Sequence, residues 1–185
     1  MDTLLLKGKP VSNELRSKLK IRIDELASYG IIPKLVAILV GDDPASQIYV
    51  RNKGRAFEKL NCRSHVYNMS VNTNDNEILD LIDEINHDMD VHGILVQLPL
   101  PQKLDSQRIL HSVSPEKDVD GFHPQNLGLL LEGNPNFIPC TPHGVLEILK
   151  FYNIPVSGRH AVIVGRSNIV GKPMFALLSQ KFERG

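Results

Sequence analysis

Two patterns of hydrophobic residues alternate along the chain, one typical of helices and one typical of buried strands. Residues 9–29 carry an apolar side chain every three or four positions, which is typical of an amphipathic helix. Residues 35–40 are a continuous apolar run that stops at a polar turn, residues 41–44, which indicates a strand buried on both faces. The helix and the strand are the first pair in a longer series.

The same alternation continues to about residue 99. The pattern predicts a helix at roughly 45–60, a short strand at 65–67, a helix through residues 78–89 and a buried strand at 93–99. Strands that alternate with helices indicate an α/β protein whose sheet is parallel and carries helices on both faces. Ligands of such sheets bind beyond the carboxyl ends of the strands, so a binding site is expected in segments 41–53, 97–102 and 165–171.

The second part of the chain begins with a connection rich in Pro, Gly, Asp and Asn, residues 114–142. A helix at 142–152 follows, with Thr141 as the expected N-cap and Pro142 at the first helical position. A strand at 160–164, a glycine turn at 165–171 and a last helix complete the series.

Composition narrows the class of protein. The 185 residues hold 21 basic and 21 acidic side chains, and this zero net charge argues against a general nucleic-acid or membrane-surface binder. Two cysteines cannot form a disulfide scaffold, and no His or Cys spacing favours a metal site. No apolar run approaches the roughly 18 residues of a membrane span, and we expect a cytoplasmic protein.

Two residues near the first turn could carry proton chemistry. Tyr49 and Lys53 are four positions apart and therefore share a helix face, and lysines in clefts can transfer protons. Gln97 stands where a buried strand ends, and its amide could orient a lysine or a substrate carbonyl. The alternatives are a solvated lysine, a partly buried tyrosine and a glutamine that points at water.

An acidic segment and a glycine loop are the other candidates. Asp118 and Asp120 could accept hydrogen bonds from the N–H edge of a guanidine-like ring, or could belong to a solvated Asp-Gly turn. In residues 165–171, Gly165 permits a turn, Gly171 permits close approach of the helix, and Arg166 could hold a 2′-phosphate. The spacing is not GxGxxG, because Ser167 stands where the second glycine would be, and a surface turn is the alternative.

Five segments together resemble one family, the methylenetetrahydrofolate dehydrogenase/cyclohydrolases of the FolD type. The segments follow the family's order and span nearly the whole chain: residues 41–50 with Lys53, 93–101, 115–124, 139–142 and 165–173. Each segment alone is a weak signal, but five in order are highly specific. An unrelated Rossmann oxidoreductase would explain the glycine loop but not residues 41–124.

The resemblance implies a fold and an activity. It implies oxidation of 5,10-methylenetetrahydrofolate to the 5,10-methenyl form with NADP, and hydrolysis of that product to 10-formyltetrahydrofolate. It also implies a folate-binding domain, residues 1–140, followed by a Rossmann NAD(P)-binding domain that starts at residue 141 and that we expect to be truncated at its C-terminus. Homodimers are expected from the family. The alternative is a truncated, non-catalytic remnant that acts as a folate-binding or interaction module.

By the same resemblance, individual residues receive roles. Lys53 is the proton-transfer group and Gln97 orients it. The folate contacts are expected from Tyr49, Leu98 and Asp120. The cofactor contacts are expected from Thr141, Gly165, Arg166, Ser167 and Gly171.

Overall fold

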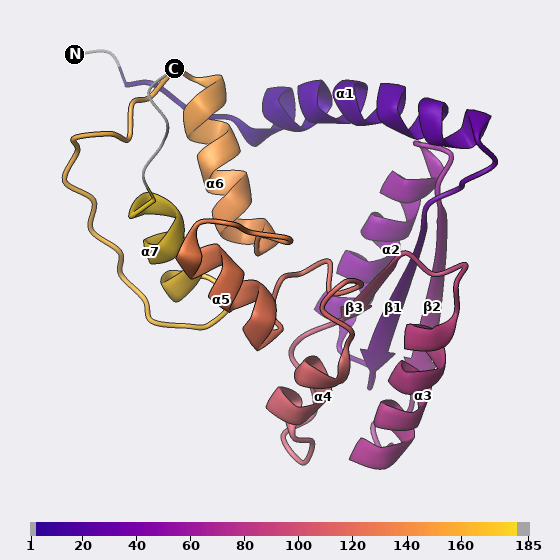
Figure 1. Cartoon of the computed structure of the whole chain (residues 1–185). Helices are drawn as coiled ribbons and strands as arrows, with labels where there is room; N and C mark the ends of the chain where they lie inside the picture. Colours follow the sequence, from indigo (N-terminus) through magenta and orange to yellow (C-terminus); the bar gives the residue numbers. More distant parts are fainter. Residues whose placement is uncertain (1–2, 181–185) are drawn as a thin grey trace. The chain divides into compact units, whose positions relative to one another are not determined.

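A computed structural model describes residues 3–180 of the chain. The helices and strands, in chain order, are α1 (Gly8–Ser28), β1 (Lys34–Val40), α2 (Pro44–Glu58), β2 (Arg63–Met69), α3 (Asp75–His87), β3 (Gly93–Val96), α4 (Ser106–Ser112), α5 (Pro124–Glu132), α6 (Cys140–Phe151) and α7 (Gly171–Leu178) (Figure 1). None of these helices is both long and apolar enough to cross a membrane.

The chain divides into two compact units. Within the described residues, one unit consists of residues 20–119, and the other combines residues 3–19 with residues 120–180. The domain boundary expected between residues 140 and 141 stays a prediction.

A parallel sheet forms the centre of the unit of residues 20–119. Its order is β2-β1-β3, and the register pairs Lys34 with Arg63 on one side of β1 and Leu35 with Gly93 on the other. β1 is the middle strand because its apolar run of residues 35–40 can be buried from both faces. The predicted α/β class with a parallel sheet is confirmed.

The two faces of the sheet are covered by different helices (Figure 1). The even-numbered side chains of β1, such as Ile38, pack with Ile78 and Ile82 of α3 and Ile109 of α4. The odd-numbered side chains, such as Ala37, pack with α2 through Val50 and Phe57. Because successive side chains of a strand point to opposite faces, one apolar run serves both layers. Helices on both faces are therefore confirmed.

The other unit has a smaller core between α5, α6 and α7. Leu130, Ala176 and Leu177 are buried together, with Leu146 packed against them. The Tyr152 hydroxyl accepts a hydrogen bond from the Lys7 backbone N–H at 3.0 Å and donates one to the Lys7 carbonyl at 3.1 Å. These two bonds fasten the segment before α1 to the end of α6.

Three expectations about this second part are wrong. Residues 160–164 do not form a strand, and Val162 and Val164 are 77% and 97% exposed. No neighbouring strand pairs with this segment within residues 3–180, and an unpaired strand leaves its backbone groups to water. The connection at 114–142 contains a helix, α5.

The third wrong expectation is the cap of α6. The helix begins at Cys140 with Pro139 at the N-cap position, so Thr141 lies inside the first turn. Pro142 is tolerated there because the first-turn N–H groups have no acceptor within the helix.

Candidate functional site

The end of β1 and the start of α2 determine where Tyr49 and Lys53 lie. Gly41 turns the chain with φ +84°, and its N–H donates to the Met69 carbonyl at 2.9 Å. Asp43 then caps α2 by accepting from the Ser46 N–H at 2.7 Å. Hydrogen bonds from the Ser46 side chain and backbone hold the pKa of Asp43 below its ordinary value. The Asp43 cap therefore starts α2 at a defined position.

Gln97 lies directly after β3, at the carboxyl edge of the same sheet. Its N–H continues the ladder by donating to the Ile38 carbonyl at 2.9 Å. Its side-chain Nε2 donates to the Leu98 carbonyl at 2.7 Å, which leaves Oε1 directed at Lys53. A cis peptide bond joins Leu98 to Pro99. The backbone thus determines which end of the amide is available as an acceptor.

Lys53 meets Gln97 across this edge. The Lys53 Nζ donates to Gln97 Oε1 at 3.5 Å, a long and weak hydrogen bond between residues 44 positions apart. Lys53 is half-buried, whereas Tyr49, one turn earlier on α2, is 62% exposed. Leu98 is half-buried and packs against the sheet core. An amine, an amide oxygen, an aromatic ring and an apolar side chain are therefore grouped at one end of the sheet.

The two acidic residues of the 118–120 segment have different surroundings. Asp118 is 5% exposed and forms a parallel bridge with Ile94 along the outer edge of β3, so it is not a solvated acid. Asp120 is half-buried in the other unit, where its Oδ1 lies 3.8 Å from the Cys140 Sγ. A Cβ on Gly121, which has φ +67°, would lie 3.0 Å from the Pro139 nitrogen. The glycine therefore lets the Asp120 turn approach the start of α6, which carries the exposed Thr141.

The glycine loop is closed by its own contacts. A Cβ on Gly171 would lie 2.4 Å from the Gly165 carbonyl oxygen, so the predicted need for glycine at 171 is real, although the close partner is the loop and not a strand. The Ser167 hydroxyl accepts from the N–H groups of Val170 at 3.1 Å and Gly171 at 3.3 Å. Arg166 is exposed beside this turn. In this conformation Ser167 accepts the N–H groups of the N-cap residue Val170 and of Gly171, the first residue of α7.

One residue with several polar contacts was not singled out from the sequence. Lys117 bonds two backbone carbonyls at the end of α3, although the sequence shows only a lysine in an acidic segment. Its position directly before the two aspartates is the only signal that could have drawn attention to it. Within residues 3–180 no group of three His, Cys, Asp or Glu side chains could hold a metal ion.

A parallel α/β unit with a lysine and an amide at its carboxyl edge, followed by a glycine loop, suits an enzyme of small-molecule metabolism. The family model for the catalytic domain of tetrahydrofolate dehydrogenase/cyclohydrolase matches residues 6–120, and the model for the NAD(P)-binding domain of the same family matches residues 139–183. The chain belongs to the tetrahydrofolate dehydrogenase/cyclohydrolase family.

Individual relatives agree with this assignment. The chain is 52% identical to the bifunctional protein FolD of Oceanobacillus iheyensis over 177 residues, which are 96% of the chain and 62% of that protein. The crystal structure of the bifunctional enzyme FolD from Campylobacter jejuni is 50% identical, with a TM-score of 0.92 over 95% of the chain and 62% of that structure.

A third similar structure was solved with a cofactor. The Trypanosoma brucei FolD complexed with NADP cofactor and inhibitor has a TM-score of 0.92 and 31% identity, over 97% of this chain and 62% of that one. The chain therefore spans about 62% of the length of the relatives that it matches.

Proposed function

We propose that this chain supplies the folate site and the first cofactor-binding segment of an enzyme of one-carbon metabolism. The enzyme would oxidise 5,10-methylenetetrahydrofolate with NADP and hydrolyse the 5,10-methenyl product to 10-formyltetrahydrofolate. The membership in the family supports both reactions. The observation that carries the proposal for this chain is the contact between Lys53 Nζ and Gln97 Oε1 at 3.5 Å.

Lys53 would carry the proton transfers of the hydrolysis. Water that adds to the electrophilic methenyl carbon must lose a proton, and the ring nitrogen that leaves must gain one. A single amine beside the reacting carbon can do both in turn. Gln97 would keep the Lys53 Nζ directed at this point, because its own Nε2 is bonded to the Leu98 carbonyl.

The folate would be held by three further residues. The exposed ring of Tyr49 is free to stack on a flat aromatic ligand, and Leu98 offers an apolar contact beside Gln97. Asp120 would accept hydrogen bonds from the amino edge of the pterin, which has the donor pattern of a guanidine. These contacts position the one-carbon unit, and positioning is a large part of catalysis in such a reaction.

The cofactor contacts would come from Thr141 and from the glycine loop. Gly165 and Gly171 give the loop its closed form, and the exposed guanidinium of Arg166 suits the 2′-phosphate that distinguishes NADP from NAD. Ser167 would have to release the N–H groups of α7 if they were to bind a phosphate. NADP held by these residues would supply the acceptor for the hydride of the methylene carbon. A homodimer in the cytoplasm completes the proposal.

A second candidate is a folate-binding module without turnover of NADP. It is favoured by the exposure of residues 160–164, which lack a paired strand within the described chain. It is also favoured because the N–H groups at the start of α7 already donate to the Ser167 hydroxyl. A Rossmann site needs its strand in place beside the glycine loop.

Two activities measured on the purified chain separate these candidates. Hydrolysis is followed as the loss of methenyltetrahydrofolate absorbance at a rate above that of spontaneous hydrolysis in buffer. Oxidation is followed as the NADP-dependent formation of methenyltetrahydrofolate. We expect Lys53→Ala to lower hydrolysis by about a hundredfold or more, while Lys59→Ala, an exposed lysine at the end of the same helix, leaves it unchanged.

The outcomes have distinct meanings. Unchanged hydrolysis in folded Lys53→Ala protein would refute the role of Lys53. Binding of folate with neither reaction in the wild-type chain would favour the module.

A further inference from the structure

A cavity of about 580 Å³ lies at the amino end of the parallel sheet, which is a volume typical of small-molecule sites. All of its lining residues belong to the unit of residues 20–119. Lys34 and Arg63, the first residues of β1 and β2, are register partners and both line it. Lys53 and Gln97 meet at the opposite, carboxyl edge of the sheet. The cavity is therefore separate from the candidate folate site.

Part of the lining is apolar and aromatic. Val36, Ile85 and Val91 line the cavity and are each at most 3% exposed. His65 and Tyr67 alternate along β2 and therefore point to the same face, where their rings meet edge to face with centroids 4.6 Å apart. A flat aromatic group can pack against such rings and lose contact with water.

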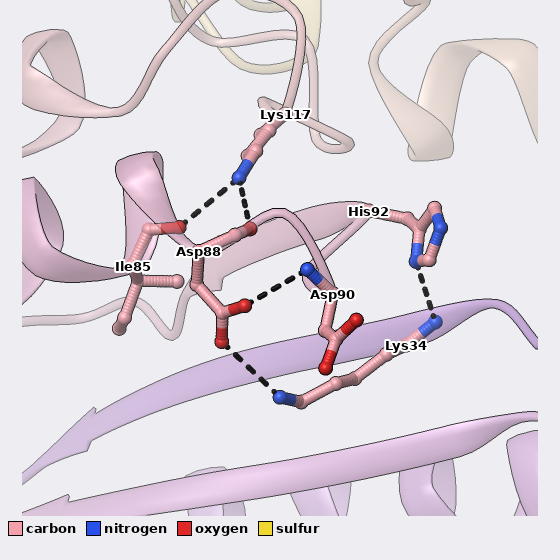
Figure 2. A network of polar contacts seen from close by, with 6 residues as sticks. All are labelled: Lys34, Ile85, Asp88, Asp90, His92 and Lys117. Atoms are coloured by element: carbon pink, nitrogen blue, oxygen red, sulfur yellow. Dashed lines mark hydrogen bonds and ion pairs between the residues drawn. The ribbon is translucent and has the colours of Figure 1, made fainter.

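Figure 2 shows the polar contacts on one side of the cavity. The Asp88 carboxylate pairs with Lys34 Nζ at 3.3 Å and accepts from the Asp90 N–H at 2.8 Å. The Asp90 N–H, with Lys34 beside it, holds the pKa of the Asp88 carboxyl below its ordinary value. Lys117 Nζ fastens the backbone here by donating to the Asp88 carbonyl at 2.7 Å and the Ile85 carbonyl at 3.1 Å. Lys34 therefore already has a charged partner that is held in place.

Arg63 is the cation that remains available. Within residues 3–180 its exposed guanidinium has no ion pair or hydrogen bond. It also lines a neighbouring hollow of about 270 Å³, together with Asp90 and His92. Glu58 and Asp88 line the larger cavity, and their like charge would repel a ligand with two negative charges. One guanidinium beside these acids suits a single carboxylate, which arginine binds through two parallel hydrogen bonds.

We propose that this cavity binds a small aromatic monocarboxylate. The carboxylate would pair with Arg63, and the ring would pack against His65, Tyr67 and the apolar part of the lining. Charge complementarity selects the carboxylate, and the aromatic pair selects the ring. The proposal is independent of the proposed function, because no lining residue is used in the folate chemistry.

A titration of the full 185-residue chain with 2-naphthoate, followed by NMR, tests this site. We expect the amides of residues 64–67 to shift with a Kd of about 1 mM, the scale for a ligand of this size, while those of Lys53 and Gln97 stay in place. Arg63→Gln should raise the Kd about tenfold. Arg108→Gln removes an exposed arginine of α4 that does not line the cavity and should leave the Kd unchanged.

Two further ligands test the chemical class. Naphthalene-2-carboxamide has the same ring without the charge, and 2-naphthyl phosphate carries a second negative charge above neutral pH. Both should bind more weakly than 2-naphthoate. Tighter binding of the phosphate, or equal binding of the amide, would overturn the monocarboxylate class.

The remaining outcomes decide whether the cavity is a site at all. Absence of shifts at residues 64–67, shifts centred on Lys53 and Gln97 instead, or an equal Kd for wild type and Arg63→Gln each overturn the proposal. None of these results depends on whether the chain hydrolyses or oxidises a folate, so the two proposals stand or fall separately.

Discussion

Gly93 at the start of β3 allows Val119 to lie directly against the strand. A Cβ added at Gly93 would lie 2.5 Å from Val119 Cγ1 and 3.5 Å from Leu35 Cδ1. Carbon atoms pack best at about 3.5–4.0 Å, so Gly93→Ala must move Val119 or the strand by roughly 1 Å. Val119 is β-branched and packs against a buried cluster that includes Leu35, which limits its other rotamers.

The expected cost follows from two opposing effects. Overpacking of this kind lowers the free energy of unfolding by about 1–3 kcal/mol. Alanine also reduces the entropy of the unfolded chain, which raises the free energy of unfolding by about 0.4–1 kcal/mol. We therefore expect Gly93→Ala to lower the free energy of unfolding by about 1–2 kcal/mol. Urea titration followed by far-UV circular dichroism measures this as a lower midpoint at unchanged slope.

Matched variants show whether the clash is the cause. Gly128 lies inside α5, and a Cβ there would meet nothing within 4 Å, so Gly128→Ala should stabilise the chain by about 0.5–1 kcal/mol. Val119→Ala removes the methyl group that blocks the alanine at 93, so the double variant should cost less than the sum of its parts. A midpoint for Gly93→Ala at or above that of the wild type would falsify the argument.

Three further predictions concern helix starts. Asn74 and Glu77 bond each other's backbone N–H groups in a capping box before α3, and Asn74→Ala should cost about 1 kcal/mol by urea titration; no change would contradict this role. Asp43 has a pKa below 3.8 because of its bonds from Ser46, so its contribution is present above pH 3.8 and is lost as the pH falls through the lower, folded-state pKa. Asp43→Asn should lack this part of the acid dependence, and identical pH profiles of stability would refute it. Ser167→Ala should speed hydrogen exchange at the two amides that its hydroxyl accepts from, and unchanged exchange by NMR would show that the hydroxyl does not protect them.

Local patterns predicted the sheet unit well. The apolar run at 35–40 and the segment at 93–96 are strands because both faces are buried, and such burial is visible as uninterrupted hydrophobic sequence. Topology predicted that the segments with Lys53 and Gln97 both leave the carboxyl edge of parallel strands, whereas the pairing of the two side chains was implied by the family resemblance. Short elements were harder to find. The helices α4 and α5 have seven and nine residues, and each depends on one side chain that is 0% exposed, Ile109 or Leu130.

Pairing and caps depend on partners that a local pattern does not contain. The apolar residues 160–164 satisfy every local criterion for a strand, yet a strand also needs a neighbour, and none pairs with them within residues 3–180. Thr141 is a good N-cap by residue type, but proline is accepted anywhere in the first turn of a helix. The pattern therefore placed the N-cap of α6 at Thr141, two positions after the observed N-cap, Pro139. The contacts of Lys117 join residues 29 and 32 positions apart.

The last turn of α3 holds more than Lys117. The Asn86 side chain donates to the Ser112 carbonyl at 2.8 Å and accepts from the Ser114 N–H at 2.9 Å, next to the two carbonyls that bind the lysine. Fraying of this one turn would release residues 112–119 at several points at once, so the helix end and the segment open as a single cooperative unit. The fraction of time for which this segment is open is therefore set by the opening equilibrium of a helix end that precedes it by some 30 residues.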